Sequence, residues 1–74
     1  MTQERVESPM PGKILSVDVK VGNKVVESET LLCVLESMKM ENPIVSPVNG
    51  TVKEVKVTSG QTVQAGAVLV VIEY

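Results

Sequence analysis

A single lysine stands between two methionines near the middle of this 74-residue chain. A free lysine amine is protonated at neutral pH, so without activation it is a weak nucleophile. It can nevertheless accept an acyl group that a separate enzyme presents in activated form. If this lysine is modified, the activation must therefore come from a separate enzyme, because these residue types supply no catalytic group. The segment reads Glu36, Ser37, Met38, Lys39, Met40 and Glu41.

The residues beside the lysine allow two interpretations. Methionine usually fills gaps in a core, and an exposed pair beside a charge is typical of a contact surface. If Met38 and Met40 instead point inward, Lys39 is an ordinary solvated lysine in a turn, and an isolated Met-Lys-Met sequence favours that interpretation. Glu36 and Glu41 are likewise either solvated strand ends or a charged rim that other proteins recognise.

The remaining side chains exclude several classes of function. The chain contains no histidine, which excludes an imidazole base and a histidine metal ligand. Its one cysteine, Cys33, excludes an intrachain disulfide and a cysteine-clustered zinc site, and its apolar neighbours predict a small buried side chain. The net charge of −2 argues against nucleic acid as a partner. We find no phosphate-binding glycine loop and no acid–base pair, so we expect no enzyme activity in the chain itself.

The length of the chain predicts one domain, over residues 1–74. No apolar run approaches the roughly 20 residues of a membrane-spanning helix, and the first residues lack the apolar core of a signal peptide. We therefore expect no direct membrane insertion and a cytoplasmic location.

The apolar residues favour β-strands. Sixteen of them are valines, whose branched side chains suit a pleated, half-buried surface. They alternate with polar residues over 13–21 and again over 52–58, with one position skipped in each segment, where we expect a β-bulge. Turn residues recur along the chain, including the pair Asn42-Pro43. This spacing predicts an all-β barrel or sandwich.

An internal repeat organises the chain. When the sequence is shifted by 38 positions, residues 6–36 lie over 44–74 without a gap. We therefore expect two similar four-stranded halves that are related by a pseudo-twofold axis, pack face to face and fold only as one unit. One mismatch sets Ser28 against Gly66: if the turn requires a positive φ, either Ser28 is mildly strained or the turn type differs. The matched pairs include Pro9 with Pro47, Gly12 with Gly50, and Gly22 with Gly60.

The segment 37–43 is the part of the chain that the repeat leaves out. It joins an expected strand over Leu31–Glu36 to another over Glu41–Val45, and a short link between antiparallel strands is a hairpin. The hairpin places Lys39 at an exposed tip. Under the pseudo-twofold axis, this tip is far from the end at which both termini emerge.

Two segments resemble the biotin carboxyl carrier (biotinyl/lipoyl attachment) domain family, and the resemblance covers about residues 6–74. Glu-Ser-Met-Lys-Met-Glu is similar to the family's Glu-Ala-Met-Lys-Met-Glu, and Ser-Pro-Met-Pro-Gly at 8–12 is similar to its Ala-Pro-Met-Pro-Gly. The resemblance implies an all-β flattened barrel-sandwich of two four-stranded antiparallel sheets, without the thumb-like insertion of some bacterial carriers. It also implies that biotin is attached covalently to Lys39. The flanking recognition residues and the hairpin rim follow by position: Met38 and Met40, then Glu36, Ser37 and Glu41.

The same resemblance implies the partners. Biotin protein ligase attaches the biotin. A biotin carboxylase then loads CO2, and a carboxyltransferase unloads it, or a decarboxylase runs the flow in the opposite direction. A tip that visits several enzymes suggests a monomeric domain with transient contacts.

Two other functions stay open. A lipoyl carrier has the same fold and a lysine on the same hairpin, but that family favours aspartate before the lysine and alanine or valine after it, where this chain has Met38 and Met40. The other is an unmodified barrel module that docks on partners, for which Lys39 is dispensable.

Overall fold

The computed structural model describes residues 2–74, and every regular element in that range is a β-strand. The valine-rich composition accounts for this, because branched side chains pack well on a pleated sheet. The predicted domain also includes Met1, which lies outside the described residues. The strands are β1 (Gln3–Glu7), β2 (Gly12–Val17), β3 (Lys24–Val25), β4 (Leu31–Ser37), β5 (Met40–Val45), β6 (Gly50–Val55), β7 (Thr62–Val63) and β8 (Val68–Glu73).

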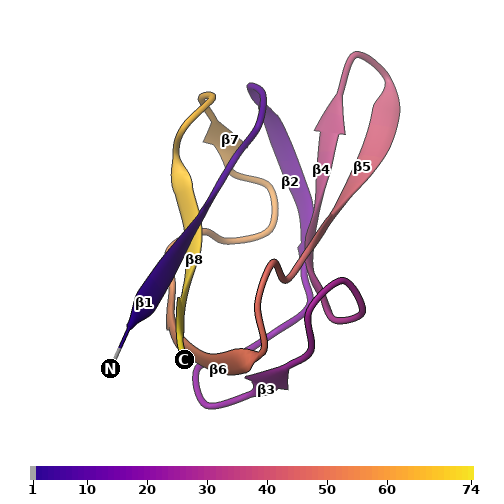
Figure 1. The fold of residues 1–74 in the computed structure, drawn as a ribbon. Coiled ribbons are helices and arrows are strands. Elements are labelled where there is room, and N and C mark those ends of the chain that lie inside the picture. The colour runs from indigo at the N-terminus through magenta and orange to yellow at the C-terminus, as the bar shows by residue number, and fades with distance from the viewer. Residues whose placement is uncertain (1) are drawn as a thin grey trace.

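The strands form two four-stranded antiparallel sheets, which confirms the predicted fold class (Figure 1). The strand order is β1-β8-β6-β3 in one sheet and β5-β4-β2-β7 in the other. We call the first the terminal sheet, because it contains the first and last strands, and the second the hairpin sheet, because it contains the β4–β5 hairpin. Within residues 2–74 there is no helix with the length and apolar character needed to cross a membrane.

The repeat maps one sheet onto the other. Exchanging β1–β4 with β5–β8 converts the first strand order into the second, as a pseudo-twofold axis requires. The predicted face-to-face packing of the two halves is wrong, however, because each sheet takes two strands from each half. The halves are interleaved, and neither forms a sheet of its own.

Reciprocal hydrogen bonds join the interleaved halves at equivalent positions. The Ile14 N–H donates to the carbonyl oxygen of Gln61 at 2.8 Å, and the Val52 N–H donates to the carbonyl oxygen of Asn23 at 2.8 Å. Each donor lies in a strand of one half, and each acceptor lies in a loop of the other. Since a buried N–H without a partner is costly, these bonds make the fold of each half depend on the other.

The predicted bulges are confirmed in both halves. The β2–β4 register shifts between Ile14 and Ser16, and the β6–β8 register shifts between Val52 and Glu54. These positions are equivalent under the repeat. Each bulge increases the local twist of its strand and lets the two sheets curve around one core.

Two loop features refine the predictions. Strand β2 ends at Val17, although the alternation continues to position 21, and Val21 is 64 % exposed at a turn. Ser28 has a φ of 63°, in the same left-handed region as the 86° of its counterpart Gly66. The turn therefore does hold Ser28 at a positive φ, which is the first of the two alternatives that the sequence left open.

Aliphatic side chains fill the space between the sheets. Leu35 of β4 has no exposed surface, and it lies three positions before Met38. Truncation of such a buried leucine to alanine typically costs about 2–5 kcal/mol. Strand β4, which leads to the tip, is thus held in place by the packing of Leu35 in the core. The largest fully buried side chains are Ile14, Leu32, Leu35, Leu69 and Ile72.

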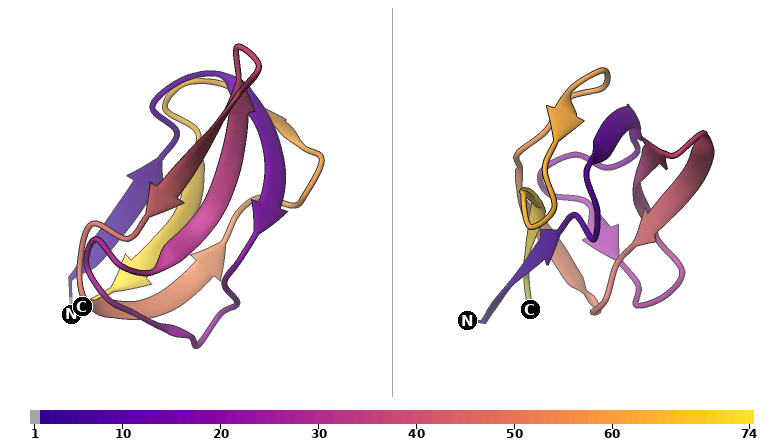
Figure 2. Two further views of the ribbon diagram at one scale, coloured as in Figure 1. Left: turned by 90° about the vertical axis from the view of Figure 1, so that its right-hand side faces the viewer. Right: turned by 90° about the horizontal axis from the view of Figure 1, so that it is seen from above.

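The molecule is elongated, with extents of 36 × 19 × 17 Å. The turn between β4 and β5 lies at one end, and the start of β1 and the end of β8 lie at the other (Figure 2). There, Thr2 and Tyr74 exchange two backbone hydrogen bonds, of 3.0 and 2.8 Å. The predicted separation of the tip from the termini is therefore confirmed.

Candidate functional site

The β4–β5 hairpin closes through two residues, Met38 and Lys39. Strand β4 runs to Ser37 and β5 begins at Met40, and these two residues pair across the turn. The segment predicted to link the two strands, 37–43, is thus longer than the two-residue turn in the structure. A short turn between paired strands leaves the lysine little freedom of position, so its backbone is presented from a rigid base.

Asn42 and Pro43, predicted as a turn, lie inside β5. Proline is tolerated there because β5 is an edge strand of its sheet, where one side of the backbone has no neighbour that needs an N–H. The side-chain amide of Asn42 donates to the carbonyl oxygens of Leu35 at 3.3 Å and Met40 at 3.2 Å. It therefore links the two strands of the hairpin just below the tip.

Both turn residues adopt a left-handed backbone conformation, with φ of 54° at Met38 and 63° at Lys39. Two consecutive positive φ values in a two-residue hairpin loop are typical of a type I′ turn. Such turns favour Asn-Gly, because a Cβ atom is strained there by about 1 kcal/mol per residue. Strain of this kind is concentrated at functional sites. No Asn-Gly or Asp-Gly pair marked this turn in the sequence.

The side chains of the tip project into solvent. Met38 is 90 % exposed, Met40 is 66 % exposed, and Lys39 is exposed between them. The interpretation in which both methionines point inward is therefore wrong. Two large apolar side chains around an accessible amine form a small patch that a partner protein can cover.

The base of the tip is anchored to the loop before β2. The hydroxyl of Ser37 donates a hydrogen bond to the carbonyl oxygen of Pro11 at 2.8 Å. Gly12 lies so close to β4 that a Cβ atom at this position would collide with the carbonyl oxygen of Glu36. The sequence placed Ser37 on the rim and did not predict this support. The sequence feature that could have indicated this support is the Pro-Met-Pro-Gly segment, which ends at Gly12.

Glu36 and Glu41 are exposed and face each other as a cross-strand pair. Side chains alternate along a strand, so this pair lies on the face of the hairpin opposite to Ser37 and Met40. Like charges directly opposite each other destabilise a sheet slightly. Lys13 is the other neighbour of Glu36 in the register and adds a positive charge nearby. Both glutamates are accessible to a partner.

Cys33 carries a thiol, which is a second group whose reactivity must be considered. It has no exposed surface, and burial, together with the carboxylate of Asp18, raises the pKa of the thiol to about 11. Since the thiolate is the reactive form, this cysteine is inert at neutral pH. The structure confirms Cys33 as a small buried side chain. Among residues 2–74, no group of three or more His, Cys, Asp and Glu side chains is arranged to hold a metal ion.

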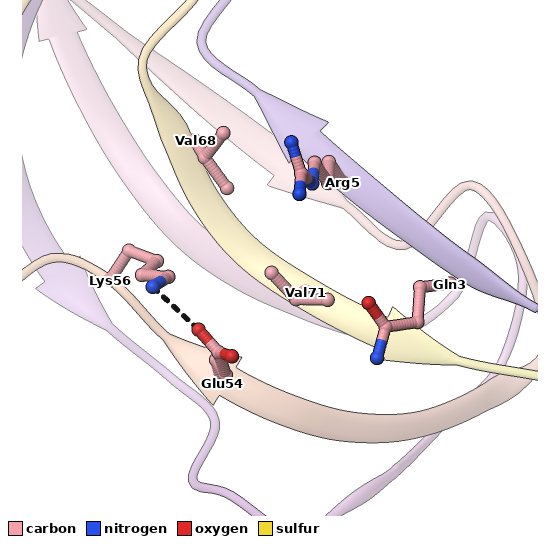
Figure 3. A pocket seen from close by; sticks show the side chains of 6 residues that line it. All are labelled: Gln3, Arg5, Glu54, Lys56, Val68 and Val71. Atoms are coloured by element: carbon pink, nitrogen blue, oxygen red, sulfur yellow. Dashed lines mark ion pairs between the residues drawn. The ribbon is translucent and has the colours of Figure 1, made fainter.

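A hollow of about 260 Å³ lies on the outer face of the terminal sheet, where β8 runs between β1 and β6 (Figure 3). On its β6 side, the ammonium group of Lys56 lies 2.6 Å from the carboxylate of Glu54. The hydrogen bond and the charge of Lys56 lower the pKa of this carboxyl. None of the predicted site residues lines the hollow, so it is separate from the tip. Its lining residues are Gln3, Arg5, Glu54, Lys56, Val68 and Val71.

The chain is similar to several known proteins. The sequence model of a family described as "Biotin-requiring enzyme" matches residues 4–72. The biotin carboxyl carrier protein of Streptococcus mutans is 54 % identical over 65 residues, which cover 88 % of this chain and 49 % of that protein. The methylmalonyl-CoA decarboxylase subunit gamma of Veillonella parvula is 55 % identical over 51 residues, which cover 69 % of this chain and 39 % of that subunit.

The fold is also similar to part of a solved carboxylase structure. The crystal structure of the urea carboxylase of Kluyveromyces lactis superposes with a TM-score of 0.90 at 25 % identity, covering 99 % of this chain and 6 % of that one. The chain thus spans about half the length, or less, of each of these relatives.

Proposed function

The chain belongs to the biotin-requiring enzyme family, and on this premise we propose that Lys39 is the residue that carries covalently attached biotin. The ε-amine of Lys39 forms an amide with the carboxyl carbon of an activated biotin, whose leaving group departs. The lysine loses its positive charge in this step. The amine needs no activation from neighbouring side chains, because the acyl donor is already activated by a separate ligase.

The observation that supports this proposal best is the exposed two-residue turn with left-handed backbone at Met38 and Lys39. An attached group requires an accessible amine with free space around it, and the tip provides both. The two exposed methionines add apolar surface on either side of the amine. The residues present therefore fit a biotinylated lysine.

The proposed partners follow from this modification. Biotin protein ligase attaches the group, and a biotin carboxylase and a carboxyltransferase or decarboxylase use it. Lys39 would hold the biotin, and the bound group would supply the chemistry that carries CO2 from one site to another. The relatives support this assignment, since one is named a carboxyl carrier and another is a subunit of a decarboxylase. The domain is a carrier, and it catalyses no step itself.

The chain's own residues hold the tip in place. The buried side chain of Leu35 packs β4 against the core, and the Ser37–Pro11 hydrogen bond fixes the base of the turn. The tip and the chain ends lie at opposite ends of a molecule 36 Å long, so the rest of a complex can hold the domain without covering the lysine. Tethering of this kind raises the effective concentration of the carried group at each partner site.

The two alternative functions make different predictions at the tip. A lipoyl carrier requires its own ligase to accept Met38 and Met40 in place of that family's usual residues. An unmodified docking module requires the methionine patch and does not require the amine of Lys39.

Intact-mass measurement after co-expression with a biotin ligase and biotin tests the proposal. We expect one biotinyl group on the wild type and none on Lys39→Arg, which keeps the charge and length of the side chain. Lys24→Arg, at an exposed lysine of β3, is the matched control and must retain the group. A folded wild-type domain that gains no biotin would favour the docking module, and a lipoyl group added by lipoate ligase would favour the lipoyl carrier.

The cellular location of the domain and the lifetime of its partner contacts are also proposals. We propose that it works in the cytoplasm and that its contacts with the partner enzymes are transient. Fractionation of the native host, with detection of the biotinylated chain by streptavidin, tests the location.

A further inference from the structure

Residues 2–74 form four sheet edges, and two of them are long enough to pair with another strand. β3 and β7 are edge strands of two residues each, and such short edges offer little to a partner. β1 and β5 are the long edges, of five and six residues. They are equivalent under the repeat, so a difference between them is informative.

The hydrogen bonds of β1 identify which backbone groups point away from the sheet. Thr2 exchanges both of its hydrogen bonds with Tyr74, and the Ser8 N–H donates to the carbonyl oxygen of Ala67 at 2.9 Å. Backbone groups alternate in direction along a strand, so the even-numbered residues of β1 face β8. The N–H and C=O groups of Gln3, Arg5 and Glu7 therefore point outward and are free to pair.

The same alternation on β5 gives a blocked edge. The Ser46 N–H donates to the carbonyl oxygen of Thr30 at 2.9 Å, so the outward positions are Glu41, Pro43 and Val45. Pro43 has no N–H, and it removes the central donor of this edge. Its counterpart under the 38-residue shift is Arg5, at the centre of the β1 edge. The edge beside the lysine tip is therefore protected from strand pairing, and the equivalent edge on the terminal sheet is not.

We propose that the free edge of β1 pairs with β1 of a second copy of this chain, antiparallel, about a twofold axis at Val6. In this register, the outward backbone groups of Arg5 meet those of Glu7 in the second copy, and the outward groups of Glu7 meet those of its Arg5. Two symmetric pairs of residues result, as a closed twofold interface requires. The two terminal sheets become one continuous sheet.

Charge complementarity selects the second copy and this register. Arg5 and Glu7 are exposed and point to the same outer face, so each guanidinium lies opposite a carboxylate of the other copy. A register centred on Arg5 would instead place two guanidinium groups opposite each other. Within residues 2–74, the ion pair present is Lys56–Glu54, so Arg5 and Glu7 are available.

The pairing is weak and leaves the tip free. β1 has only five residues, and Pro9 follows two positions after its end, so the new ladder is short and the dimer depends on concentration. β1 and the β4–β5 hairpin belong to different sheets, so both lysines stay exposed in the dimer. The monomer expected from the sequence is the dilute form of this equilibrium. The inference does not depend on the modification of Lys39.

Sedimentation equilibrium over a concentration series up to the millimolar range tests the proposal. We expect the average mass of the wild type to rise from 7.9 kDa toward twice that value. Arg5→Glu and Glu7→Arg each place like charges opposite each other, so each should weaken the dimer roughly tenfold or more. The double variant R5E/E7R restores both opposite-charge pairs in this register, and it should return the dimer to wild-type affinity.

Arg5→Pro is the matched backbone test, because it copies onto β1 the residue that the chain already carries at the equivalent position of β5. It should abolish dimer formation, and the amide NMR spectrum would verify that the variant is folded. A wild type that stays monomeric at the highest concentration, single variants with unchanged association, or a double variant that fails to recover would each overturn the proposal.

Discussion

The hydroxyl of Ser37 lies 2.8 Å from the carbonyl oxygen of Pro11 and donates a hydrogen bond to it. This bond joins the last residue of β4 to the loop before β2, at the base of the two-residue turn that carries Lys39. The residues are 26 positions apart in the sequence. The bond therefore fixes the tip against a part of the fold that is remote along the chain.

Ser37→Ala should loosen the tip. The variant loses one exposed hydrogen bond, so we expect the free energy of unfolding to fall by about 1 kcal/mol or less in urea titrations. Amide hydrogen exchange at Met38 and Lys39 should become faster. Ser59→Ala removes a comparable bond to the carbonyl oxygen of Leu15, at 2.8 Å, and should leave exchange at the tip unchanged. Equal exchange in both variants would contradict an anchoring role for Ser37.

Lys39→Gly should abolish biotin attachment and stabilise the fold. Glycine adopts the φ of 63° at this position without a Cβ penalty, so we expect a gain of about 1 kcal/mol in the free energy of unfolding. Urea titration and intact mass measure the two effects on one sample. Gly22, whose φ is 95°, provides the inverse control, because Gly22→Ala should destabilise. A less stable Lys39→Gly domain would show that the turn is not strained.

Met38→Leu and Met40→Leu should separate recognition from folding. Both side chains are mostly exposed, so we expect changes in the free energy of unfolding within about 0.5 kcal/mol. Each variant should accept biotin from the ligase more slowly, or transfer CO2 more slowly, because a branched apolar side chain replaces a flexible thioether. Steady-state rates of biotinylation and carboxyl transfer measure this. Unchanged rates in both variants would remove the recognition role of the methionines.

Gly12→Ala should destabilise the base of the hairpin. The added Cβ collides with the carbonyl oxygen of Glu36, which is backbone and cannot move without displacing β4. We expect a loss of about 2 kcal/mol or more in thermal or urea unfolding. Gly50→Ala meets the carbonyl oxygen of Glu73 at the equivalent position and should cost a similar amount, which tests the pseudo-symmetry directly. A neutral Gly12→Ala variant would mean that β2 and β4 can separate freely.

Cys33 should make stability fall at high pH. Its pKa is raised from 9.0 to about 11 in the folded chain, so the unfolded chain loses the thiol proton first as the pH rises. The free energy of unfolding should therefore be unaffected by this group below pH 9.0 and decrease between pH 9.0 and 11. We expect a loss of up to roughly 2–3 kcal/mol. Cys33→Val, which copies Val70 at the equivalent place in the register of β8, should remove this part of the pH dependence. An identical slope in the variant would exclude the thiol as its cause.

Local patterns in the sequence predicted much of this protein. Valine alternation predicted an all-β chain, and the skipped positions predicted the bulges beside Leu15 and Lys53, because periodicity is a property of the strand itself. The 38-residue repeat predicted the pseudo-twofold axis. The segment that the repeat leaves out, between the two halves, identified Lys39 as the residue at the tip.

Other features depend on contacts between distant parts of the chain, and only the tertiary structure decided them. The halves interleave because each supplies hydrogen-bond partners to the other, which no local pattern encodes. Asn42-Pro43 is typical of a turn, yet it lies in β5 because that strand has a free edge. Met38 and Lys39 keep a left-handed backbone against their own preference, since the pairing of β4 with β5 leaves room for only two residues in the turn. The sequence by itself determined which elements form and which lysine is presented, and the packing of those elements determined the geometry in which it is held.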